Sequence, residues 1–130
     1  MADYTAVRIE DMEAIYGGAM FRARASLGAS SFGLSIFELP AEFDAYPEHD
    51  HSDDGQEEVY VVLSGSAEID IEGDTVHLDP STVVRVGPGT RRKIRTGAEP
   101  VRILAIGGVP GSPYEPPQST QLGEPDPLTG

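Results

Sequence analysis

The sequence predicts an all-β protein, folded as a single sandwich or barrel of short strands. Apolar and polar residues alternate with a period of two over short segments. Turn residues separate these segments at intervals of about 8 to 12 residues, which is typical of such folds. The 130 residues suffice for one domain with one core, and 15 glycines and 11 prolines provide frequent turns.

The alternation places the expected strands in order along the chain, each followed by a turn that contains glycine or proline. They span residues 33–39, 58–63, 67–71, 75–78, 82–86, 92–96 and 101–106. Helical periodicity is weak elsewhere, with one exception at the N-terminal end. Residues 9–16 (IEDMEAIY), bounded by Gly17 and Gly18, are expected to form a short helix of about two turns.

The character of the chain changes after residue 109. We expect residues 1–109 to form the β-domain, whereas residues 110–130 contain six of the 11 prolines. Such a Pro-rich C-terminal tail cannot form regular strands or helices, so it either lies extended along a surface or is disordered. We favour a tail that packs on its own barrel or on a partner subunit, with Tyr114 and Leu122 as candidate anchors.

Composition narrows the classes of partner. A net charge of -13 disfavours nucleic acid and anionic membranes, because both need clustered Lys and Arg. The beginning lacks an apolar stretch of secretory length, and no run approaches the roughly 20 apolar residues of a membrane helix. We therefore expect a cytoplasmic protein that binds a small molecule. A homodimer is also expected, since barrels of this size often cover a sheet edge by pairing.

The strongest candidate for a functional site lies in YPEHDHSDDGQEEVYVVLSG, residues 46–65. His49 and His51 are separated by one residue, so on an extended strand both imidazoles point to the same face. Glu58 begins the next strand. If it faces the histidines, two imidazoles and a carboxylate converge, a ligand set suited to non-haem iron and usable by zinc, manganese or nickel. The alternative is a histidine pair on an exposed acidic loop, without any metal.

These residues also carry a family resemblance. HDHSDDGQEEVYVVLSGSAEI and, further on, VGPGTRRKI resemble the two motifs of the cupin superfamily, and the similarity extends over residues 33–106. The first cupin motif has HxH and then a Glu followed by six residues and a Gly, which matches Glu58 and Gly65 rather than Glu57. The resemblance implies a jelly-roll-type β-barrel with metal ligands inside. It also implies activities such as those of dioxygenases, isomerases and decarboxylases.

The sequence departs from the cupin pattern in three places. The glycine that opens the first motif is missing, and the gap between His51 and Glu58 is longer than usual. The second motif has a Pro-Gly turn and then a histidine, the fourth ligand. Here Pro88 and Gly89 form the turn, but Arg92 occupies the histidine position. An arginine cannot bind a metal ion, because it stays protonated. At a distance of about 4 Å and an effective dielectric constant near 20, the positive charge of the arginine would repel a divalent ion by roughly 8 kcal/mol.

Three arrangements of Arg92 remain open, although alternation places it on the inward face with Ile94. Arg92 could lie at some distance from a metal that His49, His51 and Glu58 hold, and bind a substrate carboxylate through two hydrogen bonds. It could instead pair with Glu58 in a metal-free pocket. It could also face water at the mouth of the barrel.

Other polar residues near the motif are weaker candidates. Tyr60 shares the face of Glu58 and could bind a substrate by a hydrogen bond, or only pack. Gln56 and Glu57 could approach an ion. His77 could replace the missing ligand only if it faced inward, and its apolar neighbours in the strand predict that it points away.

Three functions follow as hypotheses. The first is a divalent-metal enzyme, such as a dioxygenase or isomerase, that acts on a small carboxylate-like molecule. The second is a metal-free barrel that binds or senses a small molecule without catalysis. The third is a structural or storage role, in which the barrel serves to form a dimer. The cofactor is accordingly Fe, Zn, Mn or Ni, or none.

Overall fold

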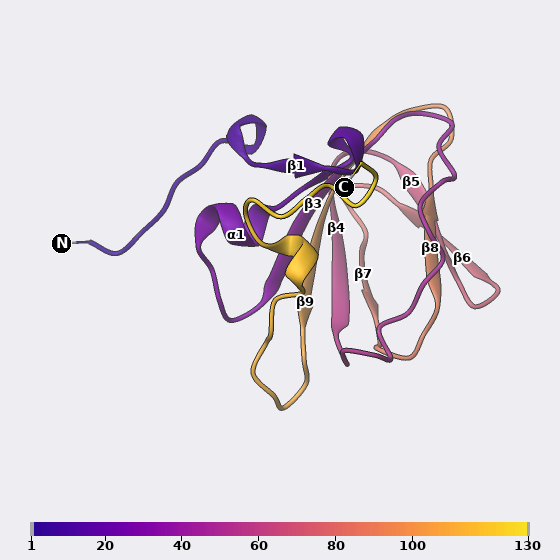
Figure 1. The fold of residues 1–130 in the computed structure, drawn as a ribbon. Coiled ribbons are helices and arrows are strands. Elements are labelled where there is room, and N and C mark those ends of the chain that lie inside the picture. The colour runs from indigo at the N-terminus through magenta and orange to yellow at the C-terminus, as the bar shows by residue number, and fades with distance from the viewer. Residues whose placement is uncertain (1, 130) are drawn as a thin grey trace.

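Two antiparallel β-sheets lie face to face in the computed structural model, which describes residues 2–129 (Figure 1). The larger sheet contains, in spatial order, β1 (Ala14–Ile15), β2 (Met20–Phe21), β3 (Gly33–Leu39), β9 (Val101–Gly108), β4 (Glu57–Gly65) and β7 (Val83–Val86). The smaller sheet contains β6 (Asp74–Leu78), β5 (Ala67–Ile71) and β8 (Arg92–Arg95). This arrangement confirms the all-β, jelly-roll-type expectation.

The expected strands are confirmed as β3 to β9, each within two residues of its expected ends. Their alternation separates two clusters of buried side chains. The main core lies between the sheets and includes Tyr60, Ile69, Ile94 and Ile103. A second, smaller core covers the outer face of the larger sheet. The central strands β3 and β9 therefore have both faces covered.

The helix expected over residues 9–16 is wrong. This segment instead forms a 3₁₀ turn, η1 (Ile9–Asp11), then β1, and then a second turn, η2, that begins at Tyr16 and ends at Gly18. Met12 and Ile15 are buried, so their spacing reflects contact with the sheet rather than a helical face. The one α-helix among residues 2–129, α1 (Ala23–Leu27), is short and ends where Gly28 adopts a φ of 75°. Within residues 2–129 no helix has the length and apolar character needed to cross a membrane.

The C-terminal tail packs back on the N-terminal part of the chain and includes a 3₁₀ turn, η3 (Gln118–Thr120). Arg22, which is 2% exposed, holds it through the carbonyl oxygens of Ser119, Glu124 and Pro125, at 2.9, 2.8 and 3.3 Å. Tyr114 is confirmed as an anchor, because its ring lies against Gly33. Leu122 is not one, since 54% of it is exposed. The boundary at residue 109 stays a prediction.

Candidate metal site

A short bridge to β8 orients the two histidines. His49 and Arg92 lie directly opposite each other and exchange backbone hydrogen bonds of 3.0 and 2.9 Å. The N–H of His51 donates to the carbonyl of Pro88 at 2.7 Å, next to the expected Pro-Gly turn. Opposite residues of an antiparallel pair project to the same face. The side chains of His49 and Arg92 therefore both enter the space between the sheets.

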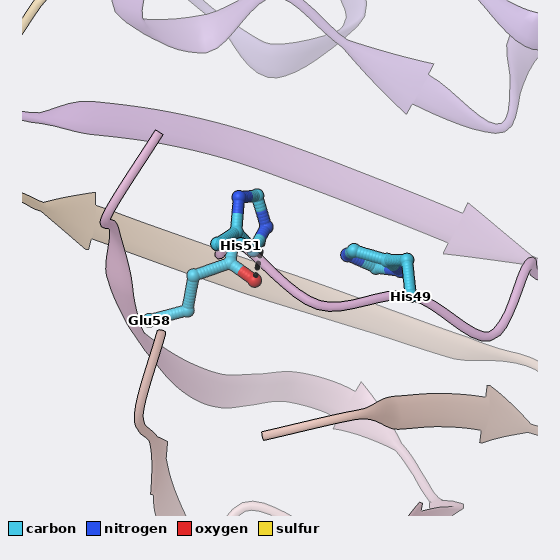
Figure 2. A group of neighbouring side chains, drawn as sticks. All are labelled: His49, His51 and Glu58. Carbon is cyan, nitrogen blue, oxygen red and sulfur yellow. Dashed lines mark ion pairs between the residues drawn. The ribbon is translucent and has the colours of Figure 1, made fainter. Parts of the chain in front are cut away.

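Glu58 approaches from the other sheet, on β4. His49, His51 and Glu58 each offer one ligand atom, and these atoms lie within 4.8 Å of one another. Figure 2 shows the Glu58 carboxylate directed at His51, with His49 beside them on the same stretch of chain as His51. Glu57 points the other way and pairs with Arg85 at 2.7 Å, so Glu58 is the inward glutamate.

The orientation of both imidazole rings fits a metal ion. His49 Nδ1 lies 2.9 Å from the carbonyl of Pro47, and His51 Nδ1 lies 3.1 Å from Asp54 Oδ1. Both partners can only accept hydrogen bonds, so in the neutral rings the proton sits on Nδ1 and the lone pair on Nε2. His51 Nε2 is buried and has no aligned hydrogen-bond partner among residues 2–129, although Glu58 Oε1 is 3.1 Å away. A ligating histidine oriented by a carboxylate or carbonyl is common in metal sites.

Glu58 stays ionised despite its burial. Burial alone would raise the pKa of Glu58, but the contacts with His51 and Tyr60 and the charge of Arg92 outweigh it, so this pKa lies below its usual value. The Tyr60 hydroxyl donates to Glu58 Oε1 at 2.5 Å. Burial, with Tyr46 and Glu58 nearby, raises the pKa of Tyr60, so this hydroxyl remains a donor. The carboxylate is thus available to bind a cation.

Arg92 faces inward as expected and is fully buried, with 0% exposure. The arrangement in which it faces water is therefore wrong. Its Nη2 donates to the carbonyls of Val86 and Gly87 at 3.4 and 3.2 Å, and its Nε lies 4.0 Å from Glu58 Oε1. Its Nε and Nη1 have no hydrogen-bond partner among residues 2–129. This geometry is a long ion pair behind Glu58, compatible with either remaining arrangement.

A cavity of about 510 Å³ opens beside His49, His51 and Glu58, which together are called the triad below. Its floor is the inner face of β3 and β9, and its walls are largely apolar and aromatic, including Phe37, Phe43 and Tyr46. Part of the C-terminal tail lines it, through Tyr114 and Leu128 among others. Neither Arg92 nor Tyr60 lines this cavity, so their contact with a substrate stays a prediction.

The remaining polar residues near the motif differ in whether they face the cavity. His77 points away as expected, is exposed, and pairs with Glu68 at 3.0 Å. Gln56 does enter the cavity. Sequence reasoning missed Asp54, which holds His51 and comes from the long loop before Glu58. The only signal was the excess of acidic residues in that loop.

Comparisons with known proteins agree with this fold. Residues 35–107 match the family model Cupin_2, described as a cupin domain. No curated protein sequence matches the chain. Among solved structures, a cupin protein from Bacteroides fragilis is 26% identical, with a TM-score of 0.70, over 92% of this chain and 95% of that one.

Two further structures are similar over less of their length or at lower identity. The DMSP lyase DddQ from Ruegeria pomeroyi is 27% identical with a TM-score of 0.56, over 74% of this chain and 47% of that one. A sugar phosphate isomerase of the cupin superfamily from Silicibacter pomeroyi is 16% identical with a TM-score of 0.67, over 80% of this chain and 75% of that one, which shows the fold alone. Because the Cupin_2 match spans more than half of the sequence, the protein belongs to this family of conserved-barrel cupins.

Proposed function

We propose that this cupin barrel binds a divalent metal through His49, His51 and Glu58, and binds or acts on a small carboxylate-like molecule in the adjoining cavity. The observation that carries the proposal is the convergence of three ligand atoms within 4.8 Å at the polar end of that cavity. Two imidazoles and one carboxylate leave further positions on an ion for substrate or water.

The residues around the triad support a catalytic ion. Pro47 and Asp54 fix the rings, and the Tyr60 hydroxyl fixes the Glu58 carboxylate. A bound ion would supply Lewis-acid or oxygen-activating chemistry. The similar structures include a lyase and an isomerase by name, so they do not select a reaction.

Elemental analysis of untagged protein, purified without chelators, tests the proposal. We expect about one Fe, Zn, Mn or Ni per chain in the wild type and a near-complete loss in His51→Ala, because removing one of three ligands leaves too few donors. His77→Ala is the matched control and should keep its metal, since His77 is exposed and outside the triad. Wild-type protein that holds no metal and takes up none on reconstitution contradicts the proposal.

The position of Arg92 favours one alternative, a metal-free barrel that binds a small molecule. The buried guanidinium of Arg92 already lies near Glu58, as a metal-free barrel would require. In that case metal-free protein should gain thermal stability with an organic acid by mass action, and added metal should change nothing. The homodimer and the cytoplasmic compartment stay predictions; light scattering at micromolar concentration checks the first.

A further inference from the structure

Two glycines make room for polar side chains next to the triad. The strand register places Gly33, Gly107 and Glu58 side by side on β3, β9 and β4. A Cβ at Gly33 would lie 2.9 Å from the hydroxyl oxygen of Tyr114, and a Cβ at Gly107 would overlap Gln56 Oε1. Gln56 and Tyr114 therefore occupy the space above this row, and both line the cavity.

The Gln56 amide has a defined orientation. Its Nε2 donates to Asp54 Oδ2 at 2.8 Å, and since a carboxylate only accepts, the atom at this position is the amide nitrogen. Gln56 is 5% exposed as a residue, and its Oε1 accepts no hydrogen bond from residues 2–129. This oxygen is not among the fully buried polar atoms that lack a partner, so it stays accessible from the cavity that Gln56 lines. An accessible carbonyl oxygen with a fixed orientation and no donor from the protein is suited to accept a hydrogen bond from a ligand.

The charge of the cavity restricts the rest of the ligand. Among the lining residues in the described part of the chain there is no Lys or Arg. The lining side chains that can carry a positive charge are His49 and His51. When these two residues bind an ion as neutral ligands, the ion is the group that neutralises a ligand carboxylate. Aromatic and aliphatic side chains line most of the remaining wall and favour an apolar or aromatic body.

We propose that the cavity binds an apolar or aromatic carboxylate whose second polar group is a hydroxyl or N–H that donates to Gln56 Oε1, with the Tyr114 hydroxyl beside it. This rests on the proposed function, because the carboxylate is held at the metal. Gln56 lies over the strand next to Glu58. The donor should therefore lie about 5 Å from the carboxylate, one strand spacing away, as in a meta-substituted benzoate.

Calorimetry with zinc-loaded protein and three probes tests the proposal: benzoate, 3-hydroxybenzoate and 3-methoxybenzoate. We expect wild type to bind 3-hydroxybenzoate about tenfold more tightly than the other two, which lack the donor. Gln56→Met keeps the side-chain length and should reduce this preference to about twofold or less. Tyr114→Phe should reduce it partially, and Gln121→Met, an exposed tail glutamine, should leave it unchanged.

Zinc content measured on the same samples separates the two proposals. Retained zinc with no preference for the hydroxyl overturns the Gln56 subsite and leaves the metal site intact. Loss of zinc in Gln56→Met also overturns the subsite, because Gln56 would then act on the metal site, either as a ligand or through Asp54 and His51. Failure of all three acids to bind with a Kd below about 1 mM overturns the ligand class. If wild type takes up none of Fe, Zn, Mn and Ni, the proposed function fails, and the same probes on metal-free protein then decide the Gln56 subsite alone.

Discussion

Three groups surround one oxygen of Glu58. Oε1 lies 3.1 Å from His51 Nε2, 2.5 Å from the Tyr60 hydroxyl and 4.0 Å from Arg92 Nε. An ion bound by the triad would take the place of the His51–Glu58 contact. The metal-free protein therefore has an ion pair that the metal-bound protein does not need.

The metal-free protein is expected to lose stability as the pH rises from about 6 to about 9. The contact with Glu58 raises the pKa of His51, against the opposing effect of partial burial. The stabilisation is complete below the unfolded pKa, about 6.5, and disappears as the pH rises through the higher folded value. Glu58, whose pKa is lowered, adds stability that disappears only in acid, as the pH falls through its folded value.

Urea unfolding in the presence of a chelator measures this dependence. Glu58→Gln removes the partner of His51, so its stability should vary less between these two pH values. If the free energy of unfolding changes equally with pH in wild type and Glu58→Gln, the ion pair contributes nothing to the pH dependence.

Local geometry predicted that the imidazoles of His49 and His51 share a face, because HxH on an extended strand needs no knowledge of strand pairing. The choice of Glu58 over Glu57 came from the cupin resemblance, through the spacing from Glu58 to Gly65. The positions of Gln56 and Tyr114 depend on the glycines beside Glu58 in the sheet. These are Gly107 and Gly33, which belong to strands that are far from Glu58 along the chain. No pattern within one segment could have revealed these positions.

At the level of elements, the end of β4 depends on close backbone contact. The pairing of β4 with β9 shifts between Val62 and Ser64, and the chain then reaches Gly65 at a φ of 78°. A Cβ there would overlap the carbonyl oxygen of Pro100, just before β9. The glycine of the motif is thus required by both conformation and space.

Gly65→Ala is expected to reduce the free energy of unfolding by about 3 kcal/mol, from the left-handed conformation together with the clash. Gly73→Ala is the matched control. Gly73 also has a positive φ, of 95°, but a Cβ there meets nothing within 4 Å, so we expect a cost of about 1 kcal/mol. Urea denaturation measures both; similar losses would show that the Pro100 contact is relieved without cost.

Strands were predictable where apolar residues alternate and turns follow, because that pattern matches one buried face. The N-terminal segment was not. Ile9, Met12 and Ile15 have helical spacing, but Met12 is buried from an irregular segment and Ile15 from the short strand β1. The real helix, Ala23–Leu27, is too short to show a periodic pattern, and only Gly28 marks its end.

On the scale of the whole molecule, Arg22 connects the two ends of the described chain. Its guanidinium is buried and pairs with Glu13, while three tail carbonyls accept its hydrogen bonds. Part of the tail also lines the cavity. The cavity wall therefore depends on Arg22, a residue that does not itself line the cavity.

Arg22→Met is expected to release the tail, because the methionine keeps the apolar stem but donates no hydrogen bond. Backbone amides of residues 118–126 should exchange at least about tenfold faster, as expected for local opening of a segment without its buried contacts. Arg8→Met is the control, since the Arg8 side chain is 77% exposed. Unchanged exchange in Arg22→Met would show that apolar contacts alone hold the tail.

The position of Arg22 also bears on folding kinetics. Its carbonyl partners lie 97 to 103 residues further along the chain, so this contact closes almost the longest loop available. Such contacts tend to form after the strands between them have assembled. A molecule bound in the cavity against the tail would then stabilise the native state but not the folding transition state. It should slow unfolding and leave the rate of folding nearly unchanged.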